Sequence, residues 1–124
     1  TAGGSALQTM ATTNHGRTGE LSAIFMSAAC DLGAFDTHGA YSAGAKLPTF
    51  VVNCYNPYDS ALKFYPLIAD SWRAQGVAPL TGKECPSAPG EVYNLDMSGS
   101  LGNEHNFQSS LPLIPQETLV KAVF

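Results

Sequence analysis

The most informative stretch of this sequence runs from Lys46 to Gln75, and its centre reads Phe50-Val51-Val52-Asn53-Cys54-Tyr55-Asn56-Pro57-Tyr58-Asp59. Residues 46–55 are rich in aromatic and β-branched side chains, and the run is bounded by Pro48 on one side and by the turn cluster 56–59 on the other, which predicts a strand. The apolar run 50–52 shows no alternation with polar residues. We therefore expect this strand to be covered on both faces and to be central in its sheet.

A helix is expected directly after this strand. Asn56 is a typical N-cap residue, Pro57 suits the first helical position, and Asp59 places a carboxylate in the first turn. Pro66 lies inside the expected helix, where its ring would remove a hydrogen bond and clash with the carbonyl four residues earlier. The sequence thus predicts strand, turn and helix between residues 49 and 75, with a kink or break at Pro66.

The rest of the chain gives weaker signals. Thr-rich residues 5–13 suit a strand, and the glycine-containing turn at 14–19 favours a hairpin with residues 20–30, although the Ala content and apolar spacing there also suit a helix. Residues 91–97 largely alternate apolar and polar side chains, as a half-buried strand does. Residues 31–45, 76–90 and 98–110 read as loops, and 117–124 as a final strand or short helix.

Together these elements predict one α+β domain over residues 1–124. We expect an antiparallel β-sheet of four or five strands flanked by helices, with one prominent helix kinked at Pro66. There are no internal repeats and no linker long enough to separate two domains.

The composition excludes several classes of partner. The chain has 124 residues, of which only 13% are charged, and its six Lys and Arg against ten Asp and Glu give a net charge of −4. With no basic cluster, we expect binding neither to nucleic acid nor to an anionic membrane surface. No run approaches the roughly 18 apolar residues of a membrane span, so membrane insertion is not expected. The opening at Thr1 suggests a removed signal peptide, and hence secretion, although a tag scar would look the same.

The three cysteines, Cys30, Cys54 and Cys85, allow one disulfide and leave one thiol over. Cys85 lies in a loop rich in Pro and Gly, whereas Cys54 lies in the expected central strand and Cys30 in an apolar run. The preferred pairing is Cys54–Cys85, with Cys30 a buried thiol. Pairing Cys30–Cys85 remains open, because spacing alone does not determine connectivity.

Few motifs in the sequence point to catalysis. There is no phosphate-binding glycine loop, no G-x-S-x-G, no C-x-x-C and no H-E-x-x-H. His15, His38 and His105 all fall in expected loops and share no metal-ligand spacing, but His38 or His105 beside a carboxylate could perform general acid–base catalysis. Residues 96–104 offer oxygen atoms at alternate positions but too few carboxylates for a calcium loop. We expect no metal and no cofactor.

Aromatic residues interleaved with amides form two groups. Sugars need this mixture, because a ring covers the C–H face of the sugar while amides or carboxylates bind the hydroxyls. The first group also has a purely structural interpretation. In it Tyr55 belongs to the core, Asn56 caps the helix and Asp59 places a charge in the first turn. The candidate ligand-binding residues are Asn53, Tyr55, Asn56, Tyr58, Asp59, Tyr93 and Asn94.

The low charge, the secreted character and the junction Cys54-Tyr55-Asn56-Pro57-Tyr58-Asp59 resemble small mushroom defence lectins of the ink-cap glycan-binding type. The resemblance implies an antiparallel sheet flanked by helices, which can continue across a dimer, and glycan recognition without metal. We therefore expect a secreted carbohydrate-binding protein with glycans or glycoproteins as partners and homodimerisation as an option. The alternatives are a small secreted hydrolase using His and a carboxylate, and a structural subunit of a capsid or extracellular filament.

Overall fold

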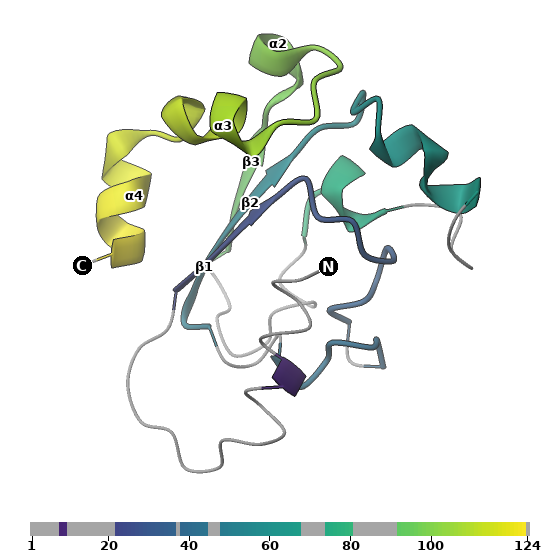
Figure 1. The fold of residues 1–124 in the computed structure, drawn as a ribbon. Coiled ribbons are helices and arrows are strands. Elements are labelled where there is room, and N and C mark those ends of the chain that lie inside the picture. Colours follow the sequence, from purple (N-terminus) through teal and green to yellow (C-terminus); the bar gives the residue numbers. More distant parts are fainter. Residues whose placement is uncertain are drawn as a thin grey trace.

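The computed structural model describes residues 8–9, 22–36, 38–44, 48–67, 74–80 and 92–123. Within these residues three strands form one sheet, and short helices follow the second and third strands (Figure 1). In chain order the elements are β1 (Ser22–Met26), β2 (Phe50–Tyr55), the 3-10 helices η2 (Leu62–Leu67) and η3 (Gln75–Val77), β3 (Val92–Asp96), α2 (Ser98–Leu101), α3 (Phe107–Ser110), η4 (Leu111–Leu113) and α4 (Gln116–Val123).

The sheet is parallel, with β2 between β1 and β3. Ser22 pairs with Phe50, and Val51 pairs with Val92. The predicted antiparallel sheet of four or five strands is therefore wrong for the described residues. Parallel neighbours need long crossover connections, which residues 27–49 and 56–91 provide. The expected hairpin depended on the turn at 14–19, which lies outside the described residues.

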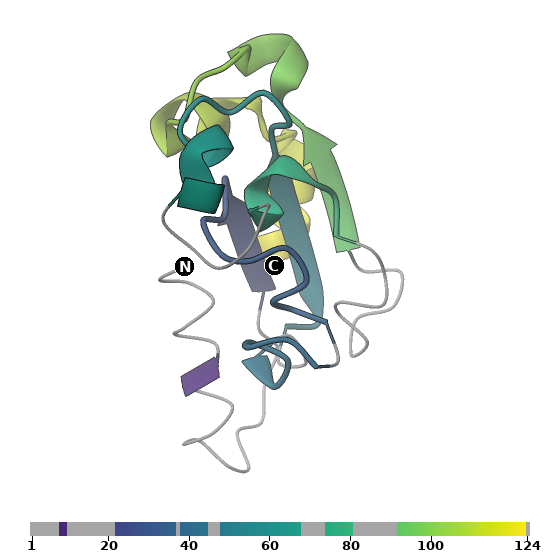
Figure 2. The ribbon, with the colours of Figure 1, turned by 90° about the vertical axis from the view of Figure 1, so that its right-hand side faces the viewer.

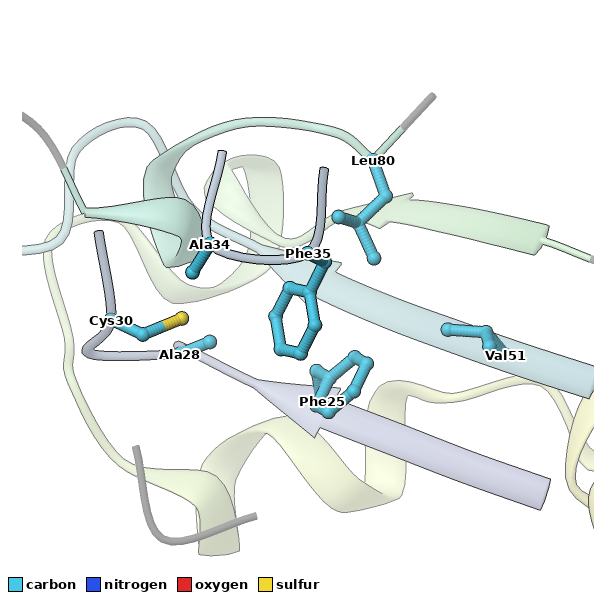
Figure 3. Close-up of a cluster of buried hydrophobic side chains, with 7 residues drawn as sticks. All are labelled: Phe25, Ala28, Cys30, Ala34, Phe35, Val51 and Leu80. Atoms are coloured by element: carbon cyan, nitrogen blue, oxygen red, sulfur yellow. The ribbon is translucent and has the colours of Figure 1, made fainter. Parts of the chain in front are cut away.

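One face of the sheet is covered by residues 28–35, which follow β1, and by Leu80, which follows η3. We call the buried side chains here the loop-side cluster (Figure 3). The rings of Phe25 and Phe35 pack against each other with centroids 4.8 Å apart, on the face of the sheet where the side chain of Val51 of β2 also lies. The members of the loop-side cluster are Phe25, Ala28, Cys30, Ala34, Phe35, Val51 and Leu80.

The other face is covered by the C-terminal part of the chain, and its buried side chains form the helix-side cluster. Figures 1 and 2 show α4 running along this face. Partly buried residues of β1, β3 and α4 complete the packing. The members of the helix-side cluster are Phe50, Val52, Cys54, Met97, Leu101 and Ile114. All five residues from Phe50 to Cys54 are buried, which confirms the predicted cover on both faces and the central position of this strand.

The predicted kinked helix between residues 56 and 75 differs most from the structure. The described part is the six-residue 3-10 helix η2, which contains Pro66, and residues 68–73 lie outside the described residues. Its cap is Asp59, because Asp59 Oδ1 accepts the backbone N–H groups of Ala61 and Leu62, each at 2.9 Å. Asn56 instead closes a turn, since its Oδ1 accepts the N–H of Tyr58 at 3.0 Å.

Some of the other predicted elements are present in the structure, and others differ from it. Strands were expected within 20–30 and 91–97, and β1 and β3 confirm them. The expected loop at 98–110 contains α2 and α3, and the C-terminal tail is the helix α4 rather than a strand. Within the expected strand 5–13, the two described residues, 8–9, are helical. None of the described helices is long and apolar enough to cross a membrane.

Gly76 of η3 should tolerate no side chain. A Cβ atom there would lie 2.5 Å from Ala28 N and 2.5 Å from Ser27 C, which are backbone atoms that cannot rotate away. We expect Gly76→Ala to lower the free energy of unfolding, measured by urea denaturation, by about 1–3 kcal/mol. Gly99→Ala is the matched control, because nothing lies within 4 Å of the added Cβ. Equal stability of the two variants would contradict the close packing of η3 against the end of β1.

Candidate functional site

Polar residues gather at the carboxyl ends of the strands. In open sheets of parallel strands, ligands bind outside this edge. Two segments meet here, namely residues 56–60 after β2 and the loop 102–106 between α2 and α3. The backbone N–H of Ser60 donates to the Asn103 carbonyl at 2.9 Å, which joins the two segments (Figure 1). This edge is therefore the place to search for a site.

The central feature of this edge is a pair formed by Asp59 and His105. Asp59 Oδ2 lies 2.6 Å from Nδ1 of His105; the carboxylate is fully buried and the imidazole is 39% exposed. Oδ1 already accepts the N–H groups of Ala61 and Leu62. Because an ionised carboxylate can only accept, Nδ1 must carry the hydrogen and donate it to Oδ2.

This assignment leaves Nε2 of the neutral imidazole as a hydrogen-bond acceptor. No described residue bonds Nε2, and the ring is partly exposed to solvent. A histidine oriented through Nδ1 by a buried carboxylate, with Nε2 open, is the arrangement of a general base. The pair can therefore accept a proton from a molecule that reaches Nε2.

A second polar group lies on the sheet itself and has a structural role. The Asn94 side chain accepts the N–H of Leu80 at 2.8 Å and donates to the Leu80 carbonyl at 2.6 Å. Asn53 Nδ2 donates to the Ala78 carbonyl at 3.1 Å and to Asn94 Oδ1 at 3.2 Å. Among the described residues, the buried Asn53 Oδ1 has no partner. These amides attach residues 78–80 to β2 and β3.

The structure separates the predicted binding residues by exposure. Asn53, Asn56 and Asp59 are at most 1% exposed and are engaged in the hydrogen bonds described above. Tyr58, by contrast, is 70% exposed and directly precedes Asp59. The two remaining tyrosines, Tyr55 and Tyr93, are half-buried, and the Tyr93 ring packs on Phe50 with centroids 5.1 Å apart. Asn94 is an exposed residue whose side chain bonds the backbone of Leu80.

Of the three histidines, the structure brings only His105 among the described residues to a carboxylate. His38 is exposed, and His15 lies outside the described residues. The sequence offered His105 as an acid–base candidate without identifying its partner. The two members of the pair are 46 positions apart, and no local spacing connects them.

Cys30 and Cys54 are buried free thiols on opposite faces of the sheet, the first in the loop-side and the second in the helix-side cluster. Burial raises the pKa of Cys54 to about 11 and also raises the pKa of Cys30. Cys85, the expected disulfide partner, lies outside the described residues, whereas both Cys54 and Cys30 carry free thiols in the structure.

No group of three or more His, Cys, Asp or Glu side chains among the described residues could hold a metal ion. Comparisons with protein-family models, with curated proteins and with solved structures find no match. Function must therefore be argued from the geometry of this edge.

The thiol of Cys54 should resist alkylation in the folded protein. With its pKa near 11, only roughly one molecule in ten thousand carries the thiolate at pH 7, and the thiolate is the reactive form. We expect iodoacetamide at pH 7 to label Cys54 in urea but not under native conditions, as read by peptide mass spectrometry. Equal labelling rates in the two states would contradict the burial of this side chain.

The same shift predicts weaker stability in alkali. Folding favours the protonated thiol, so the unfolded chain loses its proton first as pH rises above the ordinary thiol pKa. The free energy of unfolding should be unaffected by this group below that pH and should fall as pH rises towards 11. Cys54→Ala should reduce this part of the alkaline loss, measured by urea denaturation at several pH values.

Proposed function

We propose that this protein is a hydrolase in which His105, oriented by Asp59, removes a proton from an attacking water molecule. The observation that carries the proposal is the 2.6 Å contact between a fully buried carboxylate and a partly exposed imidazole. It corresponds to the hydrolase expected from the sequence as an alternative, with His105 and Asp59 in the roles of base and carboxylate.

In the proposed reaction one nitrogen atom, Nε2 of His105, first accepts a proton and then returns it. As the water oxygen attacks an electrophilic carbon, its proton passes to Nε2 of His105, and the buried Asp59 carboxylate stabilises the resulting imidazolium. The imidazolium then returns the proton to the leaving group. The N–H groups of Ala61 and Leu62, which donate to Oδ1 of Asp59, help to stabilise the negative charge of this carboxylate.

The net charge favours an uncharged substrate over an anion. Glu104, the neighbour of His105, is exposed, and the net charge of the chain is −4. This negative charge disfavours an anionic phosphoryl substrate relative to a neutral carboxylic ester.

Hydrolysis of p-nitrophenyl acetate and butyrate tests this proposal. We expect measurable turnover in the wild type, and we expect His105→Gln to lower kcat by about 10²–10⁴. Asp59→Asn should lower kcat similarly, because the amide keeps the cap through Oδ1 but places an N–H against Nδ1 and moves the histidine proton to Nε2. The exposed His38→Gln is the control and should retain wild-type kcat. Full activity of His105→Gln would contradict the proposal.

Carbohydrate binding is the second candidate, and the exposure of Tyr58 favours it. A tyrosine ring that is 70% exposed beside the Asp59–His105 pair could cover the C–H face of a sugar while Nε2 of His105 binds a hydroxyl. Three further expectations from the sequence go together with carbohydrate binding. They are a secreted location, glycan or glycoprotein partners, and homodimerisation. The capsid or filament alternative also stays a prediction.

If Tyr58 is the sugar platform, Tyr58→Ala should weaken glycan binding by about 1–2 kcal/mol through lost apolar burial. Tyr58→Phe should bind nearly as well, because it keeps the ring. Phe64→Ala, which removes another ring that is 54% exposed, is the matched control and should not change affinity. A glycan array followed by calorimetry, with and without chelator, measures the effect. Unchanged binding by Tyr58→Ala would move the sugar site elsewhere.

A further inference from the structure

We infer that Asn56 is a positioning residue, which holds the loop 102–105 so that His105 meets Asp59. The inference rests on the proposed hydrolase function of the pair. It assigns Asn56 a role in orienting the base, in place of the sugar contact expected from the sequence.

Asn56 first fixes its own segment at the end of β2. The residue is 1% exposed, its backbone N–H donates to the Gly76 carbonyl at 2.9 Å, and its carbonyl accepts the N–H of Asp59 at 3.2 Å. Its Oδ1 accepts the N–H of Tyr58 at 3.0 Å. The turn from Asn56 to Asp59 is therefore closed at both ends, and the carboxylate of the pair sits in a fixed place relative to the Asn56 amide.

The amide nitrogen of Asn56 then reaches the loop that carries the histidine. Nδ2 donates to the Gly102 carbonyl at 3.0 Å and to the Glu104 carbonyl at 3.4 Å. Glu104 immediately precedes His105, so this second bond acts on the peptide unit next to the base. All residues of the segment 102–106 are exposed, and buried Asn56 is thus a major attachment of the loop to the protein core.

This geometry gives Asn56 a task that an isosteric carboxylate cannot perform. Asn56→Asp keeps an oxygen for the Tyr58 N–H but has no N–H to donate, and an ionised carboxylate would repel the carbonyls of Gly102 and Glu104. The loop should then leave its place, and His105 should lose its bond to Asp59. Asn103→Asp is the matched control, because it adds the same charge on an exposed side chain of the loop that Asn56 contacts.

The state of His105 can be read by ¹⁵N NMR on histidine-labelled protein, which contains only three histidines. The His105 signal is assigned by its loss in His105→Gln. In the wild type at a pH where the imidazole is neutral, we expect the hydrogen on Nδ1. In Asn56→Asp we expect it to move towards Nε2, as in a free imidazole, and kcat for ester hydrolysis to fall on the order of a hundred-fold with a smaller change in KM. Asn103→Asp should show neither change.

The NMR signature separates this inference from the proposed function. A folded Asn56→Asp variant that keeps the hydrogen on Nδ1 overturns the positioning role, whether or not the protein hydrolyses esters. A shifted signature with no esterase activity in the wild type supports the positioning role and contradicts the hydrolase. If Asn56→Asp does not fold, Asn56→Ser replaces it, because its hydroxyl can accept from Tyr58 but is too short to reach Gly102. For Asn56→Ser too, the position of the His105 hydrogen and the esterase activity test the positioning role.

Discussion

The structure depends on burying both faces and both edges of β2. Val51 and Val52 are fully buried, one facing the loop-side cluster and the other the helix-side cluster. The backbone of the strand pairs with β1 on one edge and with β3 on the other, so its peptide groups are satisfied away from water. The connections and C-terminal helices serve as cover for this strand. Its carboxyl end is consequently well fixed, and Asn56 and Asp59 inherit that fixed position.

The sequence predicts this strand because its signal is local, but it does not predict the neighbours of the strand. An apolar run without alternation indicates burial on two faces, and the structure agrees for Phe50–Cys54. That same signal is typical of parallel sheets, yet the glycine-containing turn expected at 14–19 favours an antiparallel hairpin. Which strands pair depends on how residues 27–49 and 56–91 pack. That packing is a tertiary property, which turn chemistry does not encode.

The candidate site was predictable in its parts and not in its assembly. The chemistry of Asn56, Asp59 and His105 marks each of them as a candidate, but the sequence predicts Asn56 as the helix cap. A buried amide forms hydrogen bonds with any backbone group that reaches it. Here Nδ2 of Asn56 donates to the carbonyls of Gly102 and Glu104, which are distant in sequence. Asp59 therefore becomes the cap. The exposure of each side chain could not be predicted from the local sequence either, since the adjacent residues Tyr58 and Asp59 are 70% and 1% exposed.

The carboxyl group of Asp59 is one rigid plane whose two oxygens have different tasks. Oδ1 starts η2 and Oδ2 holds His105, so a rotation that improves one contact must disturb the other. The orientation of the imidazole is therefore mechanically coupled to the first turn of η2. A change in the orientation of that short helix, for example on contact with its exposed Phe64 and Leu67, would therefore reach the ring through the Asp59 carboxylate. The position of η2 and the orientation of the His105 ring are thus linked through one carboxylate.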